Sequence, residues 1–182
     1  MNFKRVEDIK GAKVISNPRY VDSRGSLTRI WDRDLFPNSI TNFTPAQINL
    51  VRIYGKGTIK GLHFQTFPSS EAKVVICISG EIFDVMVDVR NGSSTFGNYF
   101  GITLNSSHDN SVFVPAHVAH GMQNLSDYAE VLYIHGDFYD ASLELGINAL
   151  DPSINIKWPL WPGNMSKKDL GLPSLDSLRK GL

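Results

Sequence analysis

The sequence predicts an all-β fold, a jelly-roll barrel that ends in a short C-terminal helical segment. Short segments rich in Val, Ile, Phe and Tyr follow one another closely, and no helical pattern separates them. Turn formers such as YGKG, TFPSS and RNGSS lie between these segments. Closely spaced strands of this kind are typical of sandwiches and barrels. Because no repeat, low-complexity tract or linker interrupts the pattern, residues 1–182 are expected to form one domain.

The expected elements follow in chain order. Ser79 and Gly80 stand between two apolar runs and predict a tight hairpin. The tail SKKDLGLPSLDSLRK (166–180) is the clearest helical candidate, and Gly171 and Pro173 are expected to break it. The expected strands are AQINLVRIY (46–54), GTIKGLHFQ (57–65), AKVVICIS (72–79), EIFDVMVDVR (81–90), NYFGITL (98–104), SVFVP (111–115) and AEVLYIHG (129–136).

Charge and composition restrict the partners and the location that can be expected. Eighteen basic residues balance eighteen acidic ones, so bulk charge indicates neither a nucleic-acid nor a membrane partner. The amino terminus lacks the apolar run of a secretory signal, and no segment approaches the ~20 apolar residues of a membrane span. The single cysteine, Cys77, excludes an internal disulfide and lies in an apolar run, where a buried, inert thiol is expected. These features predict a reduced, soluble, cytoplasmic protein.

Two short motifs each place a histidine inside a strand-like segment. GLHFQ (61–65) carries His63, and PAHVAHGMQN (115–124) carries His120. Together they outline a double-stranded β-helix of the cupin type, in which both histidines enter one pocket. Gln65 stands where a metal-binding cupin would carry its second histidine, and a transition-metal site usually needs at least three good donors. The pocket is therefore expected to use acid–base chemistry, with no metal and no other cofactor.

The two-residue period of a strand predicts which side chains meet inside the barrel. Lys73 lies in phase with Cys77, and Tyr133 lies in phase with His135. The imidazole of His63, the ammonium of Lys73 and the phenol of Tyr133 would then all project into one barrel. Such groups are costly to bury unless they are paired or hydrated, and polar groups in a barrel mouth are typical of a ligand site.

Several stretches in a fixed order make the chain similar to one known family. They are DSRG (22–25), QIN (47–49), KGLHFQ (60–65), AKVV (72–75), GEIFDVMVDVR (80–90), STFGNYFG (94–101), VPAHVAHGM (114–122), AEVLY (129–133), INIKWP (154–159) and SKKDLGLP (166–173). In this order and spacing they resemble the dTDP-4-dehydrorhamnose 3,5-epimerase family over nearly the whole chain. The resemblance implies a metal-free cupin isomerase of deoxysugar biosynthesis. It also implies a homodimer that acts on C3, C5 or both in a nucleotide-diphosphate 4-keto-6-deoxyhexose.

The resemblance implies a role for each candidate residue of the reaction. His63 matches the base that removes a proton beside the C4 ketone, and Asp169 matches the acid that orients it. Lys73 matches the cation at the enolate oxygen, and Tyr133 matches the proton donor on the opposite face. His120 is expected to bind the substrate. Taken singly, Tyr133 could be a core aromatic, and Asp169 could be the N-cap of the terminal helix.

The residues expected to bind the nucleotide depart in part from the family pattern. Arg24, Gln47 and Asn49 match contacts to phosphate and sugar, whereas Lys60 replaces an arginine and loses its bidentate fork. Residues 22–31 resemble the segment that crosses to the partner subunit. A dTDP sugar is the default substrate, and a single-centre epimerase acting on a CDP- or GDP-linked sugar is the alternative. The other departures are Ser26, Leu27, Arg29 and Ile48.

Two other classes of function remain open. A non-catalytic cupin that binds sugar nucleotides would explain the barrel and the altered contacts. It would have no need for His63, Lys73 and Tyr133 together. A metal-dependent cupin dioxygenase or isomerase would require a poor glutamine ligand. Its ligands would be His63, Gln65, Glu71 and His120.

Overall fold

The computed structural model describes residues 1–34, 36, 43–107 and 109–181. Every expected strand is present, and the terminal segment is helical on both sides of its break. Strands not expected from the sequence lie at residues 2–5, 13–16, 19–22, 25–28 and 144–146. In chain order the elements are β1 Asn2–Arg5, β2 Lys13–Ser16, β3 Arg19–Asp22, β4 Gly25–Thr28, β5 Gln47–Tyr54, β6 Ile59–Gln65, β7 Lys73–Ser79, β8 Glu81–Asp88, β9 Tyr99–Asn105, β10 Asn110–Val114, β11 Val118–Asn124, β12 Tyr128–His135, β13 Glu144–Gly146, α1 Lys167–Leu170 and α2 Leu175–Gly181.

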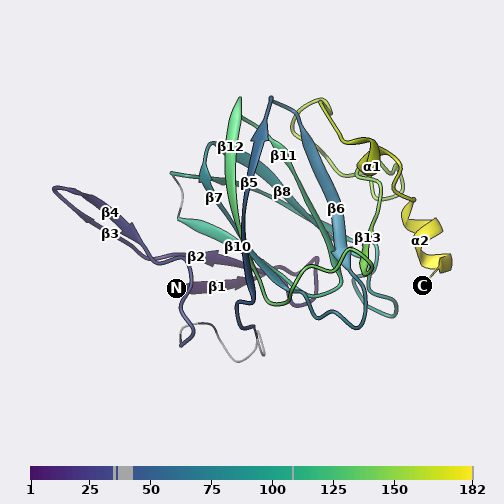
Figure 1. Ribbon diagram of the computed structural model, residues 1–182, viewed down its shortest axis with the longest axis horizontal. Coiled ribbons are helices and arrows are strands. Elements are labelled where there is room, and N and C mark those ends of the chain that lie inside the picture. The colour runs from purple at the N-terminus through teal and green to yellow at the C-terminus, as the bar shows by residue number, and fades with distance from the viewer. Residues whose placement is uncertain (35, 37–42, 108, 182) are drawn as a thin grey trace.

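Two antiparallel sheets face each other as an open jelly roll (Figure 1). The six-stranded sheet has the order β1-β2-β10-β7-β12-β5, and the five-stranded sheet has the order β13-β6-β11-β8-β9. The all-β class with a short C-terminal helical segment is therefore confirmed. None of the helices in the described ranges is long and apolar enough to cross a membrane.

The core between the sheets follows the strand phases that the sequence predicts. Val75 and Val131 of the six-stranded sheet pack with Met86 and Met122 of the five-stranded sheet. Cys77 belongs to the same cluster, and burial raises the pKa of its thiol to about 11, as expected for an inert cysteine. The alternate residues of β7 face outward into a second apolar cluster. The inward face of β7 therefore also carries Lys73 toward the space between the sheets.

The C-terminal segment packs on the five-stranded sheet and brings α1 beside β6. Leu175 and Leu178 of α2 are buried in the apolar cluster that contains Leu62 and Phe64 of β6. Strand β13 pairs with β6 up to Gly146 opposite residue 63, and backbone hydrogen bonds between Ile147 and Leu62 continue the contact by one residue. Helix α1 lies next to the earlier part of β6 (Figure 1). Packing of α2 on the sheet thus holds α1 close to the start of β6.

The connection at Ser79 and Gly80 is not the expected hairpin. Strand β7 pairs with β10 and β12, whereas β8 pairs with β11 and β9, so the chain crosses between sheets at this point. Gly80 has a φ of +73°, and a Cβ atom there would lie 2.2 Å from the carbonyl oxygen of Tyr128. Ser79 and Gly80 therefore form a tight connection that passes close to β12. The residue types in such a connection are the same as those in a hairpin turn, so the sequence alone does not separate the two.

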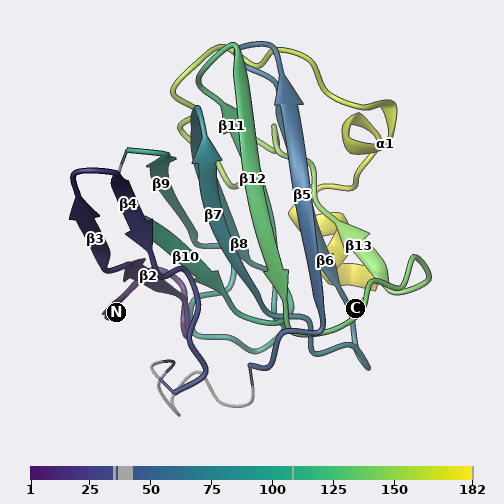
Figure 2. The same cartoon turned by 60° about the vertical axis from the view of Figure 1, so that its left-hand side comes forward.

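The β3–β4 hairpin projects away from both sheets (Figures 1 and 2). It forms a separate two-stranded sheet, and its large apolar side chains Tyr20, Val21 and Leu27 are 58%, 73% and 62% exposed. At the edge of the six-stranded sheet, β5 presents further exposed apolar side chains at Ile48 and Tyr54. Edge strands with exposed apolar side chains are prone to pair with another chain.

The crossing at Gly80 generates a stability prediction. Gly80→Ala should lower the free energy of unfolding by about 2–4 kcal/mol, because it combines a strained positive φ with steric overlap against backbone. Gly92→Ala is the matched control, since Gly92 has a φ of +76° and no atom within 4 Å of the added Cβ. It should cost only about 1 kcal/mol. Urea unfolding measures both changes. If Gly80→Ala and Gly92→Ala lose the same free energy of unfolding, the close approach of Gly80 to Tyr128 does not contribute to the cost.

Candidate active site

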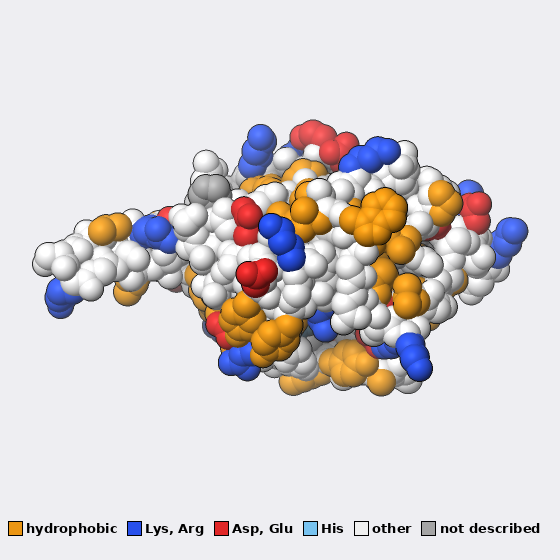
Figure 3. All heavy atoms as spheres, turned by 90° about the horizontal axis from the view of Figure 1, so that it is seen from above, with side chains coloured by type: hydrophobic (Ala, Val, Ile, Leu, Met, Phe, Trp, Pro, Cys, Tyr) orange, Lys and Arg blue, Asp and Glu red, His pale blue; other side chains and the backbone are white. Residues whose placement is uncertain are grey.

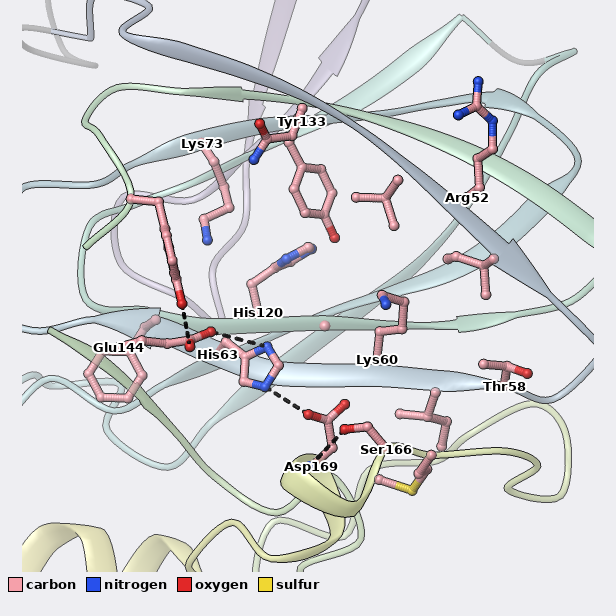
Figure 4. Close-up of a pocket in the computed structure, with 18 of the residues that line it drawn as sticks. Arg52, Thr58, Lys60, His63, Lys73, His120, Tyr133, Glu144, Ser166 and Asp169 are labelled. Atoms are coloured by element: carbon pink, nitrogen blue, oxygen red, sulfur yellow. Dashed lines mark hydrogen bonds and ion pairs between the residues drawn. The ribbon is translucent and has the colours of Figure 1, made fainter. Parts of the chain in front are cut away.

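A pocket of about 560 Å³ opens between the two sheets (Figure 4). Its walls come from β5, β7 and β12 of the six-stranded sheet, from β6 and β11 of the five-stranded sheet, and from the segment that enters α1. Its volume is in the range of small-molecule sites. The sequence-predicted residues that line it are His63, Lys73, His120, Tyr133, Asp169, Asn49 and Lys60.

His63 projects from β6 into the pocket and is held by Asp169 of α1. Its Nε2 lies 3.0 Å from Asp169 Oδ1, and its Nδ1 lies 3.9 Å from Glu144 Oε1. The other oxygen of Asp169 accepts the backbone N–H of Gly61 at 3.1 Å. Ser166, and not Asp169, is the N-cap of α1. Because a carboxylate only accepts, Nε2 carries the hydrogen and Nδ1 presents its lone pair.

The surroundings of His63 favour its neutral form. Burial lowers the pKa of the ring below the ordinary histidine value, and the negative charges of Asp169 and Glu144 only partly oppose this. A neutral imidazole with an oriented Nδ1 lone pair can accept a proton at neutral pH. The arrangement therefore suits a general base.

On the opposite wall, Tyr133 projects from β12 into the pocket (Figure 4). Burial raises the pKa of its phenol well above the ordinary value, and the negative charges of Asp84 and Glu71 add to this effect. Its ring stands edge-on to the His120 ring, with 5.5 Å between the centroids. The hydroxyl thus stays protonated and can donate a hydrogen.

His120 is buried on β11 and bonded to Asp84 of the neighbouring strand β8. The distance from His120 Nε2 to Asp84 Oδ2 is 2.7 Å. His120 and Asp84 thus form a histidine–carboxylate pair that is separate from the one at His63. This pair lies beside the Tyr133 ring, so its position affects the orientation of the phenol.

Lys73 is buried at the start of β7, next to the carboxylate of Glu71. Its Nζ lies 3.2 Å from Glu71 Oε1, and the same oxygen lies 2.5 Å from Nδ1 of His135 on β12. The three side chains line the pocket together. They provide a cation on the same wall as Tyr133.

The expected nucleotide-binding residues are only partly brought together. Asn49 and Lys60 line the pocket, and Gln47 lies next to it, with its amide nitrogen 3.1 Å from Asn49 Oδ1. Arg24 does not line it. This arginine lies in the β3–β4 hairpin, is 88% exposed and forms an ion pair with Asp22 at 2.7 Å. A single chain therefore leaves Arg24 away from the other predicted site residues.

Several residues of the site were not predicted from the sequence. Glu144 of the short strand β13 accepts a hydrogen bond from the Tyr139 hydroxyl and pairs with Lys168. No regular pattern marks that segment. Asp84, by contrast, interrupts the apolar strand EIFDVMVD, and a charged residue buried in such a strand is a signal that predicts a partner. That partner is His120.

The described residues contain no group of three or more His, Cys, Asp or Glu side chains that could hold a metal ion. His63 and His120 are bonded to separate carboxylates. The Gln65 amide is bonded to the carbonyl of Phe138 and the N–H of Asp140. These contacts do not favour the metal-dependent alternative, and metal-free catalysis stays a prediction.

Comparison with known proteins gives a consistent set of similarities. A family model described as dTDP-4-dehydrorhamnose 3,5-epimerase matches residues 7–177. The dTDP-4-dehydrorhamnose 3,5-epimerase of Mycobacterium tuberculosis (strain CDC 1551 / Oshkosh) is 34% identical over 94% of this chain and 87% of the relative.

Two solved structures resemble the chain over nearly its full length. NovW, a 4-keto-6-deoxy sugar epimerase from Streptomyces spheroides, has a TM-score of 0.94 and 31% identity, with 100% of this chain and 90% of NovW covered. The dTDP-6-deoxy-D-glucose-3,5-epimerase of Legionella pneumophila, in complex with dTDP-4-keto-L-rhamnose, has a TM-score of 0.90 and 32% identity, with 96% and 93% covered.

The contact between His63 and Asp169 predicts a shift that can be measured without substrate. The charge of Asp169 raises the pKa of His63 against the larger effect of burial, so Asp169→Asn should lower that pKa further. A proton NMR titration of the His63 ring measures the shift. Asp127→Asn changes an exposed carboxylate that does not line the pocket, so it is the control and should leave the pKa of the His63 ring unchanged. A raised His63 pKa in Asp169→Asn would contradict the assigned contact.

Proposed function

The chain belongs to the dTDP-4-dehydrorhamnose 3,5-epimerase family, and we propose that His63, Lys73 and Tyr133 carry out the family reaction in its pocket. The protein is an isomerase that acts on C3 and C5 of a dTDP-linked 4-keto-6-deoxyhexose in deoxysugar biosynthesis. One observation carries the assignment of roles. A base and a protonated phenol enter one pocket from opposite sheets, with an ammonium on the phenol side (Figure 4).

The proposed substrate is supported by the site and by a relative. The Legionella pneumophila relative was solved with dTDP-4-keto-L-rhamnose, and the pocket here is large enough for a hexose and part of a diphosphate. Lys60 is exposed on the pocket wall and can contact phosphate as a point charge. Asn49 offers an amide to the sugar or the diphosphate.

The first step is proton removal from a carbon beside the ketone. His63 Nδ1 takes this proton, and the electron pair of the broken C–H bond moves toward the C4 oxygen to form an enolate. Asp169 holds the ring through Nε2 and stabilises the imidazolium that forms. The Lys73 ammonium stabilises the negative oxygen, which is where a fixed cation contributes most to rate.

The second step returns a proton to the opposite face of the same carbon. The Tyr133 hydroxyl donates its hydrogen, the enolate electrons form the new C–H bond, and the centre is inverted. A phenol with a raised pKa is still a stronger acid than a C–H beside a ketone, so the transfer is favourable. Solvent then takes the proton from His63 and restores the one on Tyr133. The same two steps apply at C3 and at C5.

We propose a homodimer whose hairpins complete the partner's sites. The β3–β4 hairpin stands clear of the molecule as an arm (Figure 3), and β5 forms an open sheet edge beside the pocket. Exposed Val21 and Leu27 on the arm and Ile48 on β5 are apolar surface that pairing would bury. Docking of the arm on the partner would carry Arg24 to a diphosphate, where its guanidinium can bind two oxygens.

Isotope exchange separates the two proton-transfer residues. His63→Asn should lower turnover, and with it deuterium exchange at C3 and C5, roughly 10²–10⁴-fold, because the base is lost. Tyr133→Phe should retain exchange at the carbon beside the ketone but accumulate little epimer, because His63 and Lys73 still form the enolate. Proton NMR of the sugar measures both. Near wild-type exchange in His63→Asn, or equal loss of exchange and inversion in Tyr133→Phe, would contradict these roles.

Mixing of inactive variants tests the shared site. If Arg24 serves the partner's pocket, subunit exchange between Arg24→Ala and His63→Asn dimers should create heterodimers with one intact site. A random 1:1 mixture should regain about a quarter of wild-type activity. His63→Asn mixed with Tyr133→Phe is the control and should regain none, because both residues line the same pocket of one chain. No recovery, or a fully active monomer in sedimentation, would overturn the proposed dimer.

A further inference from the structure

We propose that Glu71 and His135 are positioning residues for the reaction, which hold the Lys73 ammonium at the oxygen of the enolate. This inference rests on the proposed role of Lys73 as the cation at that oxygen. Neither Glu71 nor His135 takes part in the proton transfers assigned above. Both are nevertheless buried ionisable side chains in the wall of the pocket.

The strands bring the three side chains together. His135 of β12 stands directly opposite Lys73 of β7 in the sheet register, so the two side chains project from the same face. Glu71 lies two residues before Lys73. Its Oε1 contacts both neighbours, at 2.5 Å from His135 Nδ1 and at 3.2 Å from Lys73 Nζ. Each of the three is only 7% exposed.

A line of hydrogen bonds fixes the direction of the contact between His135 and Glu71. The backbone N–H of Tyr139 can only donate, and it donates to Gln47 Oε1 at 3.2 Å. The Gln47 amide then donates to Asn49 Oδ1, which directs the Asn49 amide nitrogen at His135 Nε2, 3.3 Å away. Nε2 therefore accepts, and Nδ1 carries the hydrogen that His135 donates to Glu71.

The charge state of Glu71 agrees with this direction. Burial alone would raise the pKa of the carboxyl, but the hydrogen bond from His135 and the charge of Lys73 outweigh it and lower the pKa. Glu71 is therefore an anion that accepts two hydrogen bonds. A buried ammonium requires such a partner, because an unpaired charge in the wall of the pocket would be costly.

The unequal distances explain why a third residue is needed. A carboxylate bound to Lys73 alone would draw the ammonium toward itself and cancel much of its positive field. His135 makes the shorter contact and holds the carboxylate against β12. Lys73 then gives one of its three hydrogens to Glu71 and keeps two for the pocket. His135 thus sets how strongly Glu71 restrains the cation.

A double-mutant cycle tests whether Glu71 acts through Lys73. Glu71→Gln should lower kcat roughly 10- to 100-fold, because the cation is misplaced, and should change KM less than about threefold. In a Lys73→Met background the same substitution should change kcat less than about twofold, because nothing remains to be positioned. If the double variant loses kcat by the product of the two single-variant factors, Glu71 does not act through Lys73 and the inference is wrong. Unchanged kcat with lowered stability in Glu71→Gln would overturn it as well.

Variants at His135 provide a second, independent cycle. His135→Leu should lower kcat as Glu71→Gln does, whereas His135→Asn should restore most of it. An asparagine amide nitrogen lies as many bonds from the backbone as Nδ1 and can still donate to Glu71. If Glu71→Gln does not fold, His135→Leu with and without Lys73→Met makes the same comparison. Equal activity of the Leu and Asn variants would contradict the role of Nδ1.

Controls separate this inference from the proposed function. Glu81→Gln changes a carboxylate at the start of β8 that accepts a hydrogen bond from Asn105 and does not line the pocket, so kcat should stay unchanged. If Lys73→Met alone retains wild-type turnover, the proposed function of Lys73 is wrong. If Lys73→Met lowers kcat and Glu71→Gln lowers it further by the same factor as in the wild type, only the positioning role is wrong.

Discussion

The site depends on one constraint, which is that ionisable side chains between two apolar sheets must have partners there. An unpaired buried charge costs several kcal/mol, so each polar group at this depth needs an oppositely charged or hydrogen-bonding neighbour. The described structure meets this need with three groupings, at His63 with Asp169, at His120 with Asp84, and at Lys73 with Glu71 and His135. These same pairings orient the groups that the chemistry requires.

Burial also favours the two opposite proton-transfer roles proposed for His63 and Tyr133 through a single physical cause. It favours the neutral form of any ionisable group. For the His63 imidazole the neutral form is a base, and for the Tyr133 phenol the neutral form is an acid. Nearby carboxylates modify both groups, opposing burial at His63 and reinforcing it at Tyr133. One buried environment thus keeps both a proton acceptor and a proton donor in the required form at neutral pH.

Sequence patterns predicted what repeats along a strand and missed what depends on assembly of the sheets. The two-residue period placed Lys73 on the inward face, because that face continues into the core. The residues at 79–80 were assigned to a hairpin, because a turn motif does not report which sheet its strands join. The β3–β4 arm has no buried face to give a pattern. Asp169 was indicated by family resemblance alone, since it meets His63 across 106 residues of chain.

Because the groups proposed to react are divided between the two sheets, core packing contributes to the proposed catalytic geometry. The proposed base His63 lies on β6 of the five-stranded sheet, and the proposed cation and phenol, Lys73 and Tyr133, lie on β7 and β12 of the six-stranded sheet. The width of the gap that a sugar must fit therefore depends on the side chains that separate the sheets, such as Met86 and Val131. Protein cores pack as densely as organic crystals, so they resist changes in that spacing. The stability of this fold and the alignment of the proposed proton-transfer groups consequently have the same origin.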